Sequence, residues 1–580
     1  METTLALFVL AVCAQEPAEA KVDLSPASWP EGVLEMTLAR NAEFGGANQL
    51  VSGESGVIAG TTGAPAVRAG LEALKQGGTA ADAALTTAVT QVTLAMGSWV
   101  SYAGIFTMVY YDAEKDEVLH LNAAYNTLQG ETDPRSIPAS GASGRTALVP
   151  GFFAGIEAAH QRLGKLPFEE IFAPAIFFAE QGFPLSKFHA ALIQGRQGVL
   201  ARRESTKKIF LDQNGKFLQE GALFQQRELA RLLRRVASEG TEILYRGEWA
   251  QKLVKAVNEE GGKMSLEDLA AYQPIWSQPI RQKYRGFELM LPAIPADGGV
   301  NLAEAFLVAE EAGLAEMGPC TESAEALFWT SNLSNLFGQS FVNPAVGWLM
   351  LGGMSATPQH RLSQERAANL WERMRHDELR YFSAPKEGQT GHSDAVVVID
   401  SKGNCAAVVH SINTAAWGQT GIFVDGVSIP DSAIFQQDKI AMAGPGQRLP
   451  DPTEPLLIFK DGKLYAALSS IGGGLHQRTF GAMMNLLGHE MDLKQALDTP
   501  TLHLPAYDEH GVATAQVFEG EFETELLEKA RALGLKIETM SVSSASGHAR
   551  GYVIGAWIHP ETGCKEAMAT KILNAPAMGY

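Results

Sequence analysis

Apolar residues recur three and four positions apart through much of the first half of the chain, and this spacing predicts helices. The stretch 65–75 has a proline in its first turn and is followed by a pair of glycines, which marks both ends of a helix. Residues 79–96 begin with Thr79 and continue in small apolar side chains, as expected of a helix that is buried on most sides. The same spacing predicts helices over 152–163, 167–181 and 226–238, and further helical stretches between about 300 and 380.

Runs of β-branched and aromatic residues indicate strands at two places. Residues 105–112 and 118–122 are joined by a polar segment and predict a β-hairpin. Residues 393–400 and 405–412 predict a second hairpin, in which nearly every position is apolar. Because this second hairpin lacks alternating polar positions, we expect it to lie at the centre of a sheet, with other layers above and below it.

More strands and a glycine run follow the second hairpin. Strands are predicted over 455–459 and 464–469, and the run of three glycines at 472–474 leads into a helix that begins near His476. Strands and helices therefore come in blocks. We expect an α+β fold of four layers, an αββα sandwich, with extra helices in the N-terminal part.

The composition is typical of a large globular protein. Of 580 residues, 46% are hydrophobic, and 65 acidic side chains against 46 basic ones give a formal net charge of −19. Affinity for nucleic acid depends on clusters of Lys and Arg, so this charge argues against a nucleic-acid partner. The length alone would suggest about four domains, but the block pattern favours one layered globule.

The N-terminus has one uninterrupted apolar stretch, residues 5–14. It is too short to cross a bilayer, so we expect no membrane span there. Small residues at 18 and 20 could form a cleavage site, although no Lys or Arg precedes the apolar stretch. We interpret residues 1–20 as a signal peptide, which implies export to the periplasm or the cell exterior. If the segment is not a signal, the protein is cytoplasmic.

Several motifs that would indicate other chemistry are missing from the sequence. The 13 His and 4 Cys residues include neither H-E-x-x-H nor C-x-x-C, so we expect no metal and no organic cofactor. G-x-S-x-G, the mark of a nucleophile-elbow hydrolase, is also absent. Ser205 satisfies S-x-x-K but lies in a charged segment, and a serine hydrolase that uses Ser205 is kept as a third hypothesis.

A series of longer sequence words stands in a fixed order along the chain. They occupy 69–84, 149–151, 155–160, 173–184, 266–272, 284–286 and 295–299, followed by the hairpin at 393 and its turn at 400–404. In this order the chain resembles a divergent member of the γ-glutamyltransferase family (γ-glutamyltranspeptidase, glutathione hydrolase) of N-terminal nucleophile hydrolases, from about residue 56 to the C-terminus. The resemblance implies an αββα fold and a chain that cuts itself in front of a Thr or Ser.

The resemblance also implies which residue attacks. Family nucleophiles stand seven residues before the Asp that closes the first central strand; here that Asp is Asp400, so the nucleophile is Ser393. The implied cut follows His392 and separates a large segment, 21–392, from a small one, 393–580, which together form one globule. Thr390 is the fallback nucleophile, and His392 could donate a proton during the cut. An α-amine titrates near about 7.7–8.0 and can therefore act as the base for its own hydroxyl at neutral pH.

The same resemblance assigns partners to the nucleophile. Ser411 and Asn413 stand where the family places a hydroxyl and an amide that hydrogen-bond the nucleophile and its amine. Gly472 and Gly473 match the glycines whose backbone N–H groups stabilise the oxyanion.

Substrate recognition departs from the family pattern. The stretch 122–126 lacks the Arg that would bind the α-carboxylate of a γ-glutamyl group, and the next Arg is Arg135. Asp431 is the candidate for amine binding, and Asp451 stands where the family has the first of two serines. We expect the substrate to be a γ-glutamyl compound such as glutathione or another small amide, with water or an amine as acyl acceptor.

Two functions of different class stay open at this point. The first is an exported, self-processing amidohydrolase or acyltransferase with an acyl-enzyme on Ser393. The alternative is a non-processed pseudoenzyme of the same fold that acts as a binding module. The altered pocket residues suggest the alternative, as does Asp394, because a carboxylate beside the free amine could raise the amine's pKa and weaken it as a base.

Overall fold

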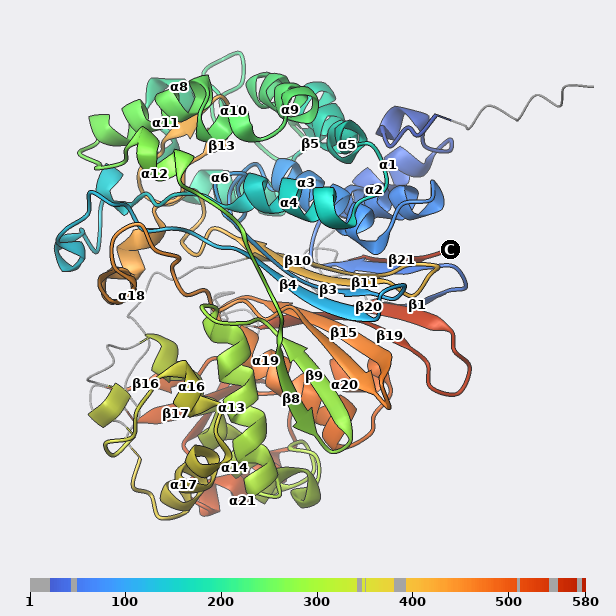
Figure 1. Cartoon of the computed structure of the whole chain (residues 1–580), viewed down its shortest axis with the longest axis vertical. Helices are drawn as coiled ribbons and strands as arrows, with labels where there is room; N and C mark the ends of the chain where they lie inside the picture. The colour runs from blue at the N-terminus through green and yellow to red at the C-terminus, as the bar shows by residue number, and fades with distance from the viewer. Residues whose placement is uncertain are drawn as a thin grey trace, which may run out of the picture.

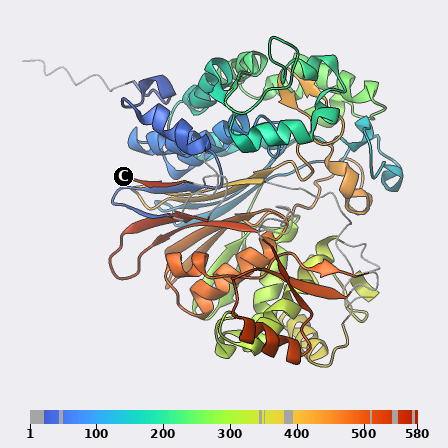
Figure 2. The same cartoon turned by 180° about the vertical axis from the view of Figure 1, so that it is seen from behind.

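Two seven-stranded sheets stack face to face in the middle of the molecule, with helices above and below them (Figures 1 and 2). The computed structural model describes residues 21–42, 49–341, 347–349, 351–379, 393–508, 512–541, 551–570 and 576–580. The interpreted signal peptide and the predicted processing residues Thr390 and His392 lie outside these ranges. The four layers confirm the αββα prediction.

The first sheet is built around the predicted central hairpin. Its strand order is β21 (Ala577–Gly579), β2 (Val57–Gly60), β10 (Ser393–Ile399), β11 (Cys405–Ser411), β3 (Ile105–Asp112), β4 (Glu117–Ala123) and β7 (Ile275–Ser277). Every residue of β10 and β11 is buried, which explains why their sequences are apolar without alternation. The predicted hairpin of residues 105–122 lies next to them as β3 and β4.

The second sheet packs against the first across an apolar core. Its order is β1 (Gln49–Gly53), β20 (Lys565–Ala569), β19 (Tyr552–Ile558), β15 (Lys463–Ile471), β14 (Leu456–Lys460), β9 (Phe287–Leu291) and β8 (Ile280–Tyr284). Ala395 and Val397 share the core between the sheets with Ile471, whereas Val396 and Val398 belong to the core under the helices. Odd-numbered residues of β10 therefore face the second sheet, and even-numbered residues face the helical layer.

The helical layers lie close to where the sequence predicts them. Over the first sheet lie α2 (Ala64–Lys75), α3 (Ala80–Leu94), α4 (Phe152–Leu163), α5 (Phe168–Gln181), α6 (Lys187–Gly195), α9 (Arg227–Glu239) and α11 (Glu248–Glu259). Helix α3 is buried along its whole length and begins in a capping box of Thr79 and Asp82. Below the second sheet lie α13 (Asp297–Glu311), α14 (Ala324–Ser334), α17 (Gln364–Arg375), α19 (Leu475–Met483), α20 (Leu493–Asp498) and α21 (Thr524–Ala532).

Both predicted segments of the chain contribute strands to both sheets. Segment 393–580 supplies β10, β11 and β21 to the first sheet and β14, β15, β19 and β20 to the second; the described residues before it supply the other strands. A cut between these segments would therefore leave two interlocked chains. Within the described residues, no helix is both long and apolar enough to cross a membrane.

Candidate active site

Two serine hydroxyls meet at the end of the central hairpin. Ser393 begins β10 and is the register partner of Ser411, the last residue of β11. The Ser393 hydroxyl donates a hydrogen bond to Ser411 Oγ at 2.8 Å, and Ser411 Oγ also accepts from the backbone N–H of Asn413 at 3.0 Å. Both serines are buried. The structure thus brings together three residues that the family resemblance selects.

Asn413 is held in an uncommon backbone conformation. Its φ is 51°, in the left-handed region that Asn tolerates better than most residues. The preceding carbonyl, of Ile412, accepts hydrogen bonds from Tyr125 Oη at 3.2 Å and Ser432 Oγ at 2.6 Å. These two donors fix the turn, and the Asn413 side chain then donates from Nδ2 to Asp451 Oδ1 at 3.2 Å.

Asp451 extends this chain of hydrogen bonds. Its Oδ2 accepts from Thr107 Oγ1 at 3.2 Å and from the hydroxyl of Thr453. Burial raises the pKa of the Asp451 carboxyl, while hydrogen bonds from Thr453 and Asn413 act in the opposite direction. Ser393, Ser411, Asn413 and Asp451 therefore form one continuous hydrogen-bonded series, although Asp451 was selected from the sequence only as a substrate-binding candidate.

Asp431 is engaged elsewhere. Its Oδ1 accepts from Thr414 Oγ1 at 2.6 Å and its Oδ2 from the backbone N–H of Gln419 at 2.8 Å. Burial raises the pKa of this carboxyl, opposed mainly by the hydrogen bond from Thr414. Both oxygens thus hold the loop that follows Asn413.

The glycine run connects the second sheet to a helix. Strand β15 ends at Ile471, Gly472 has a φ of 91° that favours glycine, and α19 begins at Leu475. Neither Gly472 nor Gly473 donates its backbone N–H to another residue in the described parts of the chain. These amides and the N-terminus of α19 are the kind of donors that stabilise negative charge.

Arg448 was not predicted from the sequence as part of this region. Its Nε donates to Asn126 Oδ1 at 2.7 Å, its Nη1 to Asn122 Oδ1 at 2.8 Å, and its Nη2 to the carbonyl of Gln273 at 2.7 Å. The guanidinium also lies over the ring of Tyr272, 4.7 Å from its centroid. An Arg therefore does reach the stretch 122–126, from a segment more than 300 residues away, but all three of its nitrogens are committed to the protein's own oxygens.

The side chains of Asp394 and Ser393 lie on opposite faces of the first sheet. It is fully buried on the helical side of β10 and accepts hydrogen bonds from Thr61 Oγ1 at 2.9 Å, Thr62 Oγ1 at 2.7 Å and Trp99 Nε1 at 2.9 Å. Burial raises its pKa to about 7. The alternation of side chains along a strand thus turns this carboxylate away from the face on which the Ser393 hydroxyl lies.

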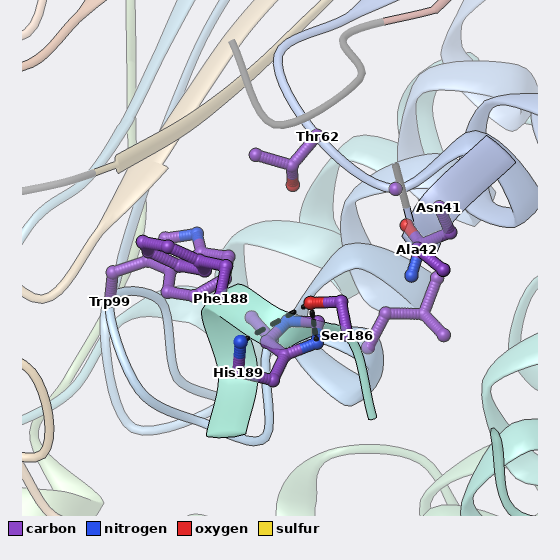
Figure 3. A pocket seen from close by; sticks show the side chains of 10 residues that line it. Asn41, Ala42, Thr62, Trp99, Ser186, Phe188 and His189 are labelled. Atoms are coloured by element: carbon purple, nitrogen blue, oxygen red, sulfur yellow. Dashed lines mark hydrogen bonds between the residues drawn. The ribbon is translucent and has the colours of Figure 1, made fainter. Parts of the chain in front are cut away.

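A small pocket opens beside two of the Asp394 donors (Figure 3). Thr62 and Trp99 line it together with Ser186, Phe188 and His189, which come from the start of α6. Its volume is about 20 Å³, enough for roughly one water-sized group. Ser186 Oγ lies 3.1 Å from His189 Nδ1 on its wall.

No group of three His, Cys, Asp or Glu side chains that could hold a metal ion occurs among the described residues. The thiols of Cys320, Cys405 and Cys564 are free.

The stacked sheets and helical layers place the protein in the class of N-terminal nucleophile hydrolase folds. A solved structure of cephalosporin acylase from Bacillus halodurans superposes with a TM-score of 0.73 at 20% identity, covering 96% of this chain and 99% of that one. The family model described as Gamma-glutamyltranspeptidase matches residues 66–555. The chain belongs to this family, whose members are self-processing hydrolases and transferases.

Curated relatives include a glutathione hydrolase and an acylase. A glutathione hydrolase proenzyme of Pseudomonas sp. (strain A14) is 27% identical over 407 residues, which cover 66% of this chain and 69% of that protein. An Acylase ACY 1 proenzyme of Pseudomonas sp. (strain SE83) is 26% identical over 377 residues, which cover 61% of this chain and 64% of that protein.

Proposed function

We propose that this protein is a self-processing amidohydrolase or acyltransferase that attacks small amides with the hydroxyl of Ser393. The observation that carries the proposal is the 2.8 Å hydrogen bond between Ser393 Oγ and Ser411 Oγ at the first residue of a buried central strand. A hydroxyl at this position would become N-terminal when the chain is cut before it, which gives it an α-amine as its own base. Membership in a family of self-processing hydrolases supports this assignment.

The chemistry follows from the groups around that hydroxyl. In the cut protein, the free α-amine of Ser393 takes the proton from Oγ, and Oγ attacks the carbonyl carbon of the amide. The N–H groups of Gly472 and Gly473 stabilise the negative charge that forms on the carbonyl oxygen. The C–N bond then breaks, the ammonium returns the proton to the leaving amine, and an ester remains on Oγ. Water or an amine attacks this ester, gives a proton to the α-amine, and releases the acyl group as Oγ is reprotonated.

For the substrate, we propose small amides whose acyl group is not bound through an α-carboxylate. An Arg binds a carboxylate best through two parallel N–H groups, whereas the hydrogen bonds of Arg448 to Asn126, Asn122 and Gln273 leave it a single N–H, on Nη2. The ionisable side chain that joins the hydrogen-bonded series of Ser393 is instead a carboxyl, that of Asp451, which contacts Asn413 directly. The acylase name of one relative is compatible with such a substrate. We also propose export, from the apolar segment at the N-terminus.

The test compares wild type with Ser393→Ala on a denaturing gel and in amide hydrolysis. The proposal predicts two fragments and activity for wild type, and one intact, inactive chain for Ser393→Ala. Ser205→Ala serves as the matched control and is expected to keep both cleavage and activity. An intact, inactive wild-type chain would instead support the pseudoenzyme alternative. Loss of activity in Ser205→Ala alone would identify Ser205 as the nucleophile.

A further inference from the structure

A second polar pair lies directly behind the serine pair. Asp394 and His410 are register partners on β10 and β11, each adjacent in sequence to one of the paired serines. Both side chains are fully buried on the helical face, where Val396 and Val398 are otherwise part of an apolar core. Burying a carboxyl in such a core costs free energy unless it is well hydrogen-bonded.

The hydrogen bonds of Asp394 all lead to segments outside the hairpin. Thr61 and Thr62 follow the end of β2, and Trp99 lies in the connection between α3 and β3. Thr61 also binds the strand itself, since its Oγ1 accepts from the backbone N–H of Ala395 at 2.8 Å. These hydrogen bonds hold the first residues of β10 to two loops on the helical face of the first sheet.

Among the described residues, no cation neutralises Asp394. His410 binds Gln91 Oε1 through Nε2 at 2.9 Å, and burial lowers its pKa to about 3. His189, whose ring stacks on Trp99 with centroids 5.8 Å apart, has its pKa lowered by burial to about 4. Both imidazoles are neutral at pH 7, and no Lys or Arg forms an ion pair with Asp394 in the described parts of the chain. The carboxyl therefore depends on its three neutral donors.

The pocket in Figure 3 is lined by both Thr62 and Trp99. On its wall the Trp99 ring packs against Phe188, with centroids 5.6 Å apart, and stacks on His189. Packing therefore helps to place Trp99, and the hydrogen bonds to Asp394 join Trp99 and Thr62 to the strand.

We propose that Asp394 is a positioning residue for the nucleophile. Its carboxylate anchors the first residues of β10 to Thr62 and Trp99, and so fixes the direction of the Ser393 hydroxyl on the opposite face of the first sheet. This inference rests on the proposed function of Ser393. The coupling is covalent, because the two residues share a peptide bond and point to opposite faces of the same strand. A misplacement of a reacting atom by about 1 Å can cost about a hundredfold in rate.

The test uses three variants of the full-length protein. Asp394→Asn keeps the shape but removes the carboxylate, and Thr62→Val removes one donor to it. Thr90→Val is the matched control, because Thr90 is equally buried but its hydroxyl binds only the carbonyl of Thr86 within α3. We expect kcat to fall about tenfold or more in the first two variants, with KM within about twofold of wild type, and no change for Thr90→Val. Slower self-cleavage of the first two variants counts as the same defect, since the same hydroxyl attacks.

A pH profile separates positioning from general loss of structure. Protonation of Asp394 gives its oxygen a proton that Trp99 Nε1, a donor only, cannot accept. We expect the ratio of kcat for wild type to kcat for Asp394→Asn to rise as the pH increases through about 7. If Asp394→Asn does not fold, Thr62→Val decides. Cleaved Asp394→Asn or Thr62→Val with wild-type kcat and a constant ratio would overturn the inference, whereas activity in Ser393→Ala would overturn the proposed function instead.

Discussion

Asp451 Oδ1 lies 3.2 Å from Asn413 Nδ2, and this hydrogen bond joins a carboxylate from the segment before β14 to the turn that supports the serine pair. The contact orients the side-chain amide of Asn413. Because Thr107 and Thr453 hold the other carboxylate oxygen, the orientation of Asp451 is itself fixed.

The first prediction concerns this contact. Replacing Asp451 with Ala leaves the Asn413 amide free to turn away, and we expect kcat/KM to fall about tenfold or more, as for loss of a hydrogen bond to a charged group. Steady-state amide hydrolysis measures the effect. Asp461→Asn, in the exposed turn between β14 and β15, is the control and should behave as wild type. Unchanged kinetics in Asp451→Ala would show that Asp451 does not contribute to catalysis.

The second prediction concerns the glycine run. Gly472→Ala puts a side chain at a φ of 91° and shifts the amides that follow, so we expect kcat to fall about 100- to 1000-fold. Gly462→Ala is the matched control: its φ of 74° imposes similar strain, and an added Cβ meets no atom within 4 Å. Equal effects of both substitutions would mean that backbone strain alone explains the loss.

The third prediction concerns Arg448. Arg448→Met removes hydrogen bonds to Asn126, Asn122 and Gln273, so we expect the free energy of unfolding to fall by about 1–3 kcal/mol. The measurement is urea unfolding in the Ser393→Ala background, where the chain stays whole. Specificity should not change: the ratio of kcat/KM for a γ-glutamyl amide to that for an acyl amide without a carboxylate should match wild type. A selective loss of the γ-glutamyl amide would show that Arg448 binds its carboxylate.

The fourth prediction is a dependence of stability on pH. Asp394 binds its proton more tightly in the folded protein, with a pKa of about 7 against 3.8 for the ordinary carboxyl. Its contribution is fully present below about pH 4 and is lost as the pH rises through about 7. Between about pH 5 and 7, Ser393→Ala should therefore lose about 2 kcal/mol of unfolding free energy relative to Ser393→Ala with Asp394→Asn, since the full slope of about 1.4 kcal/mol per pH unit falls off near the folded pKa. A difference that does not vary with pH would contradict the buried, proton-binding state of Asp394.

These stability and rate effects oppose each other. The ionised form of Asp394 is the one that accepts from all three donors, but it is also the form that burial disfavours. The ionised carboxylate that holds the start of β10 therefore lowers the stability of the fold.

The sequence predicted the central layers well because their signal is local. The continuous apolar runs of β10 and β11 indicated a strand pair covered on both faces, and helices α2 to α5 and α9 lie within two residues of the predicted ranges. Strands β1 and β20 were not predicted, since they pair across more than 500 residues and no local pattern reports such a pairing. Pairing between segments so far apart in one chain is determined by tertiary packing.

Part of the candidate site could be predicted from the sequence. Ser393, Ser411 and Asn413 were selected by the resemblance to the family, and they lie together because Ser393 and Ser411 are register partners in one hairpin. Arg448 was missed because a distant segment supplies it to Asn122 and Asn126. The orientation of Asp394 was available from strand alternation alone: a residue next to Ser393 in a strand points to the other face, so its carboxylate does not lie beside the Ser393 hydroxyl.

The mass and N-terminal sequence of the smaller fragment test the central claim most directly. Purified wild-type protein should yield a fragment that comprises residues 393–580 and begins Ser-Asp-Ala-Val, with a free α-amine on Ser393. A chain that stays whole through purification and assay, or a fragment that begins at Thr390, would contradict the account of Ser393 as the nucleophile.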